Sequence, residues 1–436
     1  MKRRDFLSLT ACTAAALTGA PGLSTPRIDP AGQRPGVPLR PNLRGDDFVV
    51  SGESFFEGHA DKLADLIADT VTDTLQGLRV GRGHGGAIDV FASRDLIVIG
   101  GTVAGPWGPM IECIDDSFWD RYEAPVRQLL RETGHHQNPF GVDPQAVEIR
   151  FSSIVQCFDI ALDALGEPGP DEPVRLYGYA TDETPELMPL PTLLAQRLSA
   201  RAAEVRRSGV LPWLLPHGRV RVSVLYASGV PVAVDSVELI AQHRPEIYTN
   251  HFREEIVDKV LVPVIPEHLI SRQTKLLLNP TGPCVIGGLA IKCGISGGSL
   301  ASDTYGAYCP LPSARLAGQG TLNIERSGTL MARHLAKHIV AADLARRCTV
   351  HLAYRTGEAE PEAVLVDTHG TGTLPEERIE RGIRAVFPLT PWAVFEYLDL
   401  GRPIYRNAAA FGYFGRQEPA LTWERTDKVS ELMAAV

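Results

Sequence analysis

Cysteine, basic charge and long apolar runs are scarce in this sequence, and each shortage excludes a class of protein. The seven cysteines are an odd number and include no Cys-x-x-Cys pair, which argues against a disulfide framework or a zinc ribbon. No uncharged apolar run reaches the roughly 18 residues needed to span a bilayer, so no transmembrane segment is predicted. The net charge of −9 leaves no general basic surface, and no nucleic-acid partner is predicted.

The remaining composition is that of a folded protein. Hydrophobic residues make up 44% of the 436 positions and charged residues 22%, which excludes a mainly disordered chain. The 41 glycines and 33 prolines are spread along the chain and predict many turns. At about 100–200 residues per domain, the length corresponds to about two to four domains or to one large intertwined unit.

The first 45 residues are predicted to lie outside the folded body. Residues 2–7, Lys-Arg-Arg-Asp-Phe-Leu, have the twin-arginine pattern, and a charge-free stretch follows to residue 20. Residues 1–20 are therefore interpreted as a twin-arginine signal peptide, which would export the folded protein. The alternative is a mis-assigned start codon, which would leave the protein in the cytoplasm. Residues 21–45 are rich in proline and glycine and are interpreted as a linker.

Hydrophobic periodicity predicts hairpins and helices along the body. Helical spacing predicts helices at 63–75, with Asp61 placed to cap its start, and at 192–207, 328–347 and 376–387. Runs rich in β-branched residues predict a strand at 146–155 and three hairpins, which pair 88–92 with 96–103, 219–227 with 231–241 and 350–354 with 363–367. Three hairpins, each followed by helical sequence, favour an α+β fold over a doubly wound parallel sheet.

The densest polar cluster of the body is Glu57-Gly58-His59-Ala60-Asp61-Lys62. It precedes a predicted helix, whose N-terminus favours anions through its free N–H groups and its dipole. In that setting His59 and Lys62 are predicted to face a phosphate, and Asp61 to hold a divalent cation to it. The alternative is a solvated capping turn without a chemical role.

Three other groups are weaker candidates. Residues 279–306 are rich in glycine, but they contain neither a Gly-x-Gly-x-x-Gly fingerprint nor a phosphate-binding P-loop, so their glycines are interpreted as turns. His135 and His136 have no carboxylate or cysteine at ligand spacing and are interpreted as an exposed loop pair. His334 and His338 lie one helical turn apart, and without a third ligand they are interpreted as residues of a helix face.

Six short motifs follow one another through the body. In chain order they are Glu53-Ser54 with Glu57-Gly58-His59-Ala60-Asp61-Lys62, Gly178-Tyr179-Ala180-Thr181-Asp182-Glu183-Thr184, Leu211-Pro212-Trp213-Leu214, Asn279-Pro280-Thr281-Gly282 with Val285-Ile286-Gly287-Gly288, Asp303-Thr304-Tyr305-Gly306, and Phe414-Gly415-Arg416 with Trp423-Glu424 and Thr426-Asp427-Lys428. This series resembles the S-adenosylmethionine synthetase (methionine adenosyltransferase) family, in which the first motif reads ES..EGHPDK. The matches run from about residue 46 to residue 430, and Asp65, Asp69 and Asp73 repeat the family's aspartate spacing.

The resemblance implies a fold, an assembly and a reaction. The implied fold is S-adenosylmethionine synthetase-like, with three similar α+β subdomains related by pseudo-threefold symmetry, expected at 46–165, 170–272 and 273–436. The implied assembly is a homodimer or homotetramer. The implied reaction is attack of the sulfur of L-methionine on C5′ of ATP, followed by cleavage of the leaving triphosphate, with Mg²⁺ and K⁺ as cofactors.

Family residues carry over to matching positions of this sequence. His59 and Arg219 match catalytic positions, and Arg219 stands where the family has a phosphate-binding lysine. Metal positions are implied at Asp61 and Glu325 for Mg²⁺ and at Asp89 for K⁺. Substrate- or nucleotide-binding positions are implied at Glu53, Lys62, Gln156, Asp159 and Lys292.

The sequence departs from the family mainly at charged positions. Lys292 replaces a substrate-binding aspartate, Gln319 and Asn323 replace two lysines, and Gly297-Gly298-Ser299 replaces a Gly-Arg-Lys segment. One well-placed cation contributes a factor of about 10³–10⁵ to the rate of phosphoryl transfer. The sequence lacks four cationic side chains of the family's pocket, so efficient reaction of ATP with methionine is not assured by the resemblance.

Three functions are therefore compatible with the sequence. The first is a synthetase that forms S-adenosylmethionine or acts on an altered substrate. The second is a catalytically impaired paralogue that binds an adenosyl compound or nucleotide, or serves as a partner subunit. The third is a hydrolase that uses the same cleft through His59 and a metal ion.

Overall fold

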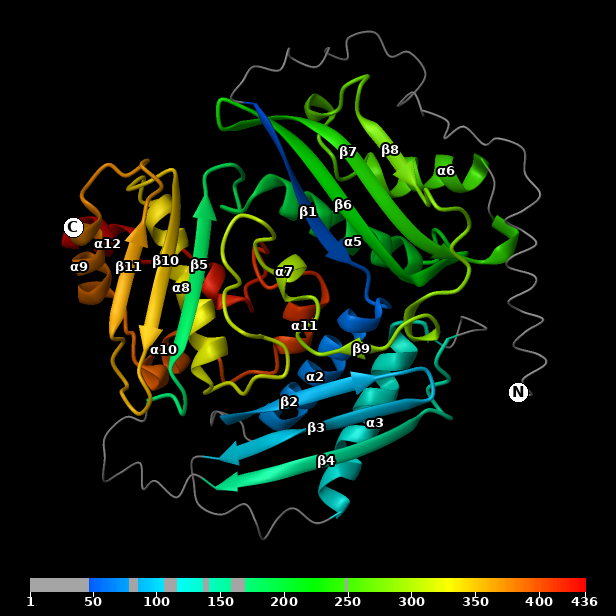
Figure 1. The fold of residues 1–436 in the computed structure, drawn as a ribbon, viewed down its shortest axis with the longest axis horizontal. Coiled ribbons are helices and arrows are strands. Elements are labelled where there is room, and N and C mark those ends of the chain that lie inside the picture. The colour runs from blue at the N-terminus through cyan, green and yellow to red at the C-terminus, as the bar shows by residue number, and fades with distance from the viewer. Residues whose placement is uncertain (1–46, 78–84, 106–115, 136–140, 158–168, 248–249) are drawn as a thin grey trace.

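Three small sheets surround a central group of helices (Figure 1). The computed structural model describes residues 47–77, 85–105, 116–135, 141–157, 169–247 and 250–436. The predicted signal peptide and linker fall outside these ranges and stay predictions. Within them, no helix is both long enough and apolar enough to cross a bilayer. The predicted α+β fold class is confirmed.

The first sheet contains the hairpin predicted at 88–103. β2 (Gly85–Ala92) and β3 (Leu96–Gly105) pair antiparallel, with Val90 opposite Ile99. β4 (Glu148–Cys157) lies parallel to β3. The other edge is the two-residue strand β9 (Gly294–Ile295), which pairs with β2 and brings a distant loop to this sheet.

The second sheet has the order β1-β6-β7-β8. β1 (Phe48–Phe55) pairs antiparallel with β6 (Leu214–Ala227), which forms the predicted second hairpin with β7 (Val230–His243). β8 (Lys275–Leu278) adds a parallel edge to β7.

The third sheet has the order β11-β10-β5. β10 (Arg347–Tyr354) and β11 (Ala363–Asp367) form the predicted third hairpin, and β5 (Val174–Thr181) pairs with the other edge of β10.

One helix of 18 residues accompanies each sheet. α2 (Ala60–Gly77) contacts β2 and β9, α5 (Leu190–Arg207) contacts β1 and β6, and α8 (Ile324–Ala341) contacts β5 and β10. This repetition supports the predicted three-part architecture. The further helices are α3 (Asp116–Glu132), α6 (Asn250–Ile256), α7 (Leu300–Asp303), α9 (Glu376–Val386), α10 (Pro391–Tyr397), α11 (Tyr405–Ala410) and α12 (Val429–Ala435), with a π-helical turn at Val257–Leu261 and 3₁₀ turns at Pro245–Ile247, Glu267–Leu269, Gly288–Ala290 and Thr422–Glu424.

The helix predicted at 328–347 has different bounds in the structure. Asn323 caps α8, because its side-chain oxygen accepts a hydrogen bond from the Glu325 N–H at 2.9 Å, and the helix therefore begins at Ile324. It ends at Ala341, and Asp343 adopts a φ of 54° that no continuing helix allows. The last residue of the prediction, Arg347, is the first residue of β10.

The sheets do not correspond one to one with the three predicted segments of sequence. β1 belongs to segment 46–165 but pairs with β6, β5 belongs to segment 170–272 but pairs with β10, and β9 from the last segment pairs with β2. The subdomain boundaries therefore stay a prediction, and neighbouring segments exchange strands across them.

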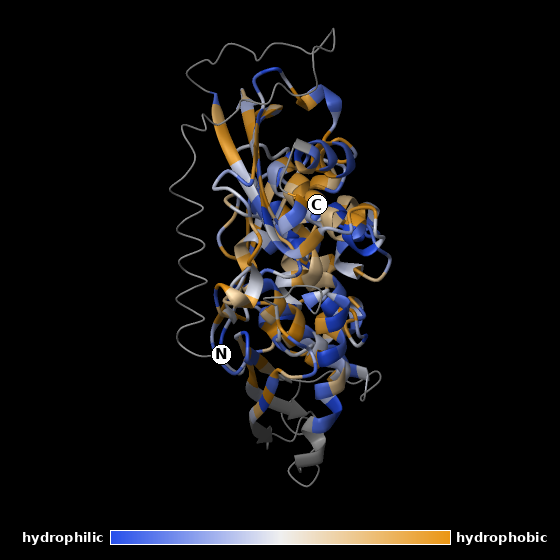
Figure 2. Ribbon diagram, turned by 90° about the vertical axis from the view of Figure 1, so that its right-hand side faces the viewer, coloured by the Kyte–Doolittle hydropathy of each residue, from blue (hydrophilic) through white to orange (hydrophobic). Residues whose placement is uncertain are grey.

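Hydrophobic residues form two packed cores. The larger core joins the first and third sheets through α2 and α8, and the smaller one lies between α5 and the second sheet. In the side view of Figure 2 the molecule is narrow, and orange residues gather on the strands and helices inside it. Most residues of α2 are buried, as expected for a helix at the centre of a fold.

Four aspartates on one face of α2 anchor remote segments of the chain. Asp61, Asp65, Asp69 and Asp73 are spaced by four residues and so line up along the helix. They accept hydrogen bonds from backbone N–H groups of Ile295 (3.3 Å), Gly297 (2.6 Å), Gly318 (2.8 Å), and Tyr405 and Arg406 (both 2.9 Å), respectively. We call these four residues the aspartate row.

Buried cations neutralise part of this negative charge. The guanidinium of Arg326 pairs with Asp69, whose second oxygen accepts a hydrogen bond from the Tyr413 hydroxyl at 3.1 Å. Both members of the Arg326–Asp69 pair are fully buried. Removal of one partner would leave an uncompensated buried charge, which is strongly destabilising.

The Asp73→Asn variant is expected to change how stability depends on pH. Burial raises the pKa of Asp73 from 3.8 to about 7, so the folded state binds an extra proton between these values. The stability that the Asp73 carboxyl contributes to the wild type is therefore lost as the pH rises from about 4 to about 7, and the variant lacks this effect. The free energy of unfolding of the wild type minus that of the variant should fall between about pH 4 and 7, by at most about 1.4 kcal/mol per pH unit, and should stay level above that range.

Denaturant unfolding at several pH values measures this difference. Thr74→Ala is the matched control, because Thr74 is the next residue, carries no charge and bonds within α2 to the Thr70 carbonyl. Its difference from the wild type should not change with pH. An equally constant difference for Asp73→Asn would contradict the raised pKa.

Candidate active site

The turn between β1 and α2 presents His59, and the first turn of α2 presents Asp61. Its backbone is fixed to β6 by hydrogen bonds from Phe56 N–H to Gly218 O (3.0 Å) and from Gly58 N–H to Pro216 O (2.9 Å). A Cβ on Gly58 would lie 2.6 Å from Pro216, so this close approach requires glycine.

The imidazole of His59 is buried between aromatic rings. It stacks on Phe55, with ring centroids 4.0 Å apart, and on His217 at 5.6 Å. Burial lowers the pKa of His59 to about 3, and the nearby His217 and Lys292 add to this effect. Burial likewise lowers the pKa of His217 to about 4. Both rings are therefore neutral at pH 7.

His59 keeps one ring nitrogen available. Its Nδ1 is buried and has no hydrogen-bond partner among the described residues. This nitrogen lies 3.9 Å from Oδ2 of Asp61. Since a buried polar atom without a partner is costly, the atom is suited to receive a ligand.

The sequence predicted that Asp61 caps its own helix, and this prediction is wrong. Asp61 instead faces the loop around β9. Its Oδ2 lies 2.6 Å from Nζ of Lys292, and its Oδ1 accepts a hydrogen bond from the Ile295 N–H. Lys292 is about half exposed. The structure therefore unites His59, Asp61 and Lys292, three residues selected from the sequence.

A second charged group lies on the other side of the same loop. A Cβ on Gly298 would lie 2.9 Å from the Asp61 carboxyl carbon, and one on Gly297 would lie 3.3 Å from Arg315 Cβ. Arg315 forms an ion pair with Asp89. Its charge also acts on Glu325, whose pKa is raised mainly by burial and lowered in turn by Arg315. The loop at 294–298 thus connects Asp61 to the predicted metal residues Asp89 and Glu325.

Arg219 and Glu53 lie on the second sheet beside the histidines. Arg219 pairs in register with Phe55, whose ring stacks on His59. Its guanidinium lies 3.9 Å from Glu53 and 3.5 Å from Glu238, and it is about half exposed. It is therefore a neighbour of the His59 group, paired with carboxylates.

Two members of the predicted polar cluster turn away from this site. Lys62 is fully buried, forms an ion pair with Asp303 and donates a hydrogen bond to Ala409 O at 2.9 Å. Its ammonium is already neutralised inside the core, which argues against the predicted contact with phosphate. Glu57 is also buried and pairs with Arg206 and Arg207 of α5.

Two of the predicted substrate- or nucleotide-binding residues, Gln156 and Asp159, are described in part or not at all. The backbone of Gln156 lies in β4, in register with Ala104. Asp159 falls outside the described residues. Both assignments stay predictions.

Sequence reasoning missed His217 and the role of Arg315. His217 follows Pro216 in β6, and no spacing in the sequence links it to His59, 158 positions earlier. Arg315 meets Asp89 across 226 positions. The sequence offered no local signal for His217, because the same strand also contains Arg219, Arg221 and Ser223.

A separate cavity lies between the second and third sheets. Its volume is about 520 Å³. It is lined by charged residues that include Glu183, Glu186, Arg197 and Arg346, and it includes no residue of the His59 group.

Comparison with known proteins decides the family. Residues 168–284 match the central domain of S-adenosylmethionine synthetase, and residues 286–425 match its C-terminal domain. The chain is 39% identical over 404 residues to the S-adenosylmethionine synthase of Desulforudis audaxviator (strain MP104C), covering 89% of this chain and 98% of the relative. This chain belongs to the S-adenosylmethionine synthetase family.

Membership in the S-adenosylmethionine synthetase family confirms the resemblance inferred from the motifs. It identifies the chain as a synthetase-like transferase that acts on small molecules. The His59–Asp61–Lys292 group belongs to the first motif and to the loop before β9, so it lies where the motifs had indicated the site.

The Gly294→Ala variant is expected to loosen the site. A Cβ at this position would clash with the Ala60 carbonyl oxygen, and Lys292 and Ile295 flank it. We expect a loss of about 1–3 kcal/mol in the free energy of unfolding, as for other overpacked positions. Denaturant unfolding measures the loss. Gly77→Ala is the control, because nothing lies within 4 Å of the added Cβ, and an equal effect of both changes would contradict the close packing.

The His59 ring is expected to stay neutral between about pH 5 and 8. Burial lowers its pKa to about 3, so its nitrogen chemical shifts should not change across this range. Nitrogen NMR of histidine-labelled protein measures them, and the spectrum of His59→Gln assigns the signal. A His59 signal that titrates near 6.5, the usual histidine pKa, would contradict the assigned environment.

Proposed function

We propose that this protein forms S-adenosylmethionine from ATP and L-methionine and cleaves the leaving triphosphate. The observation that carries the proposal is the His59–Asp61–Lys292 group, in a chain that aligns with nearly the whole length of a curated synthase. A neutral imidazole, a carboxylate and an ammonium then converge where a nucleotide phosphate can reach all three.

His59 has a defined part in this proposal. With a pKa of about 3, it does not act as a cationic acid at neutral pH. A neutral imidazole can still donate a hydrogen bond from one nitrogen, and its unpartnered Nδ1 is the free contact. We assign to it a hydrogen bond to the oxygen that leaves C5′, where negative charge develops.

Three cations can act on the triphosphate in place of the missing lysines. Lys292 and Arg219 are each about half exposed, and Arg315 is about one third exposed. Each of the three side chains is paired with a carboxylate in this structure. Together they place three positive charges around the loop, and each could exchange its carboxylate for a phosphate. The long side chain of Lys292 can turn from Asp61 to a phosphate without backbone movement.

The carboxylates of the site fit the proposed cations. Asp61 and Glu325 offer the oxygen ligands that Mg²⁺ prefers, and Asp89 is the proposed K⁺ position. No described residue donates a hydrogen bond to the Glu325 carboxylate, and burial raises its pKa, so a bound cation would stabilise its charged form. When bound, Mg²⁺ would supply charge for the triphosphate.

A second candidate is a nucleotide-binding paralogue with impaired turnover. Gln319 and Asn323, which replace two lysines of the family, hydrogen-bond to each other at 2.7 Å, and Asn323 also caps α8. These side chains are committed to structure and supply no positive charge. This observation favours binding with slow chemistry.

Assembly and domain limits belong to the same proposal. We propose a homodimer or homotetramer, and subdomains near 46–165, 170–272 and 273–436 that exchange strands β1, β5 and β9. Export through the twin-arginine signal stays a prediction of residues 1–20.

The purified chain incubated with ATP, L-methionine, Mg²⁺ and K⁺ tests the reaction. S-adenosylmethionine and phosphate are measured separately. We expect both products, and we expect His59→Ala to lower kcat by about 10²–10³, the usual effect of losing a hydrogen-bond donor to a developing negative charge. His251→Ala is the control, because His251 is exposed on α6, and its kcat should match the wild type.

Other outcomes separate the candidates. Binding of ATP or S-adenosylmethionine without turnover would refute the synthetase proposal and favour the nucleotide-binding paralogue. Phosphate release from ATP that does not depend on methionine would favour the hydrolase.

A further inference from the structure

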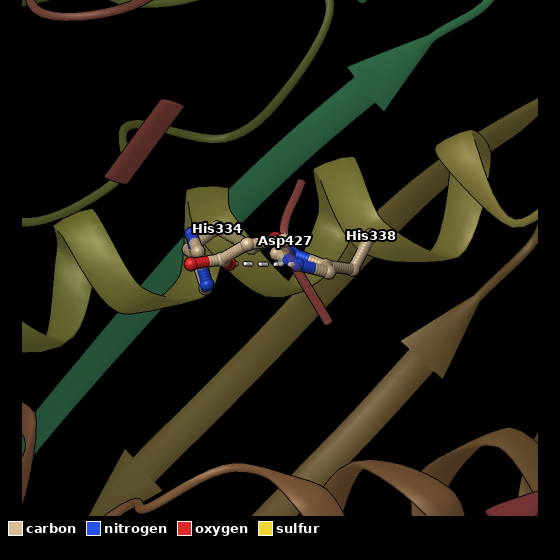
Figure 3. Close-up of side chains that lie close together, drawn as sticks. All are labelled: His334, His338 and Asp427. Atoms are coloured by element: carbon tan, nitrogen blue, oxygen red, sulfur yellow. Dashed lines mark hydrogen bonds and ion pairs between the residues drawn. The ribbon is translucent and has the colours of Figure 1, made fainter. Parts of the chain in front are cut away.

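A group of potential metal ligands lies at the C-terminal half of α8, in residues that the proposed reaction does not use. His334 and His338 are one turn apart and buried, and Asp427 is about half exposed beside them (Figure 3). One ligand atom from each of the three residues lies within 4.8 Å of the other two. Asp427 thus supplies the third ligand that the sequence analysis did not find.

Backbone carbonyls orient both imidazoles. His334 Nδ1 lies 3.2 Å from Trp423 O, and His338 Nδ1 lies 2.8 Å from His334 O. A carbonyl only accepts hydrogen bonds, so both protons reside on Nδ1, and both Nε2 atoms carry lone pairs. Metal-binding histidines are typically oriented by this kind of contact at the nitrogen that does not bind the metal.

The lone pairs now accept hydrogen bonds that a metal ion can replace. Tyr397 O–H lies 3.0 Å from His334 Nε2, and the Lys428 N–H lies 3.1 Å from His338 Nε2. Asp427 Oδ1 is already 3.7 Å from His338 Nε2. The hydroxyl can rotate, and the Lys428 amide precedes α12 next to the surface, so neither donor is confined to the core.

We propose that His334, His338 and Asp427 bind one divalent transition-metal ion of the Zn²⁺ class. Two neutral imidazoles and one carboxylate form a ligand set typical of such ions and unlike the all-oxygen sets of Mg²⁺. Ligand atoms of a tetrahedral zinc site are about 3.4 Å apart, so the group must contract by at most about 1.4 Å. Asp427 can move because it is exposed at the end of the Trp423–Lys428 segment.

Such an ion would have a structural effect. It would join α8 to the segment that leads into α12. These two parts of the fold already contact each other through the Trp423 and Lys428 hydrogen bonds and through the ion pairs of Arg333 and Lys337 with Glu424. Binding to the folded state alone raises stability by mass action. The site is separate from the His59 group, so its existence does not depend on the proposed reaction.

Titration of the full chain with Zn²⁺ and with Co²⁺ tests the site. Excess Mg²⁺ is kept present to occupy carboxylate-only sites. We expect one bound ion per chain, visible absorption of tetrahedral Co²⁺ and a higher unfolding temperature. Asp427→Asn should weaken binding by at least about tenfold, since even outer contacts of metal sites contribute about 10–100-fold. Asp427 is exposed, so the variant should fold.

Glu431→Gln is the matched control. Glu431 loses the same charge, lies four residues away and pairs only with Lys428 among the described residues, so its affinity should equal that of the wild type. His338→Gln provides a second loss of ligand. Absence of a bound ion would refute the proposal. Equal affinity in Asp427→Asn and the wild type would also refute it, because the ion would then occupy another place. The Asp61→Asn variant should bind the ion as the wild type does, and a loss of binding there would place the ion at the His59 group and refute the proposal.

Discussion

Four carboxylates on a buried helix face require partners, and this requirement organises the molecule. The aspartate row of α2 accepts backbone N–H groups from Ile295, Gly297 and Gly318 and from the start of α11. Buried carboxylates are costly unless they are paired or hydrogen-bonded, so these remote segments must close over α2. The loop that carries Lys292 is held against Asp61, which is only partly buried, by the Lys292 ammonium and the Ile295 N–H.

The candidate site follows from this closure and from charge balance. Asp61 is compensated by Lys292, Asp89 by Arg315, and Glu53 in part by Arg219. His59 stays neutral because it is buried between Phe55 and His217. Exposed pairs of this kind contribute little to stability, about 0–1 kcal/mol. They can therefore be exchanged for contacts with an anionic ligand at small cost.

Local sequence predicted the helices and strands well, but it did not predict which remote residues contact one another in the fold. The three hairpins and α2, α5 and α9 follow from apolar periodicity and turn residues, whereas the bounds of α8 depended on Asn323 and Asp343, whose capping and backbone geometry no hydrophobic pattern encodes. Motifs located His59 and Asp61. They could not separate Asp61 from Lys62, because adjacent helical residues point about 100° apart and only the tertiary fold decides which of them faces the loop. His217 and Arg315 reach the site across 158 and 226 positions.

The exchange of strands among the sheets has a consequence for synthesis of the chain. β1 has no partner until β6 is made about 160 residues later, which at about 5–20 residues per second takes about 10–30 s. β5 likewise cannot pair until β10 has been synthesised. The first sheet is complete only after β9 has left the ribosome. A ribosome-bound chain therefore exposes unpaired strand edges for most of its translation, and these edges invite aggregation unless a chaperone covers them. A truncated chain that ends before β10 would leave the third sheet without its central strand.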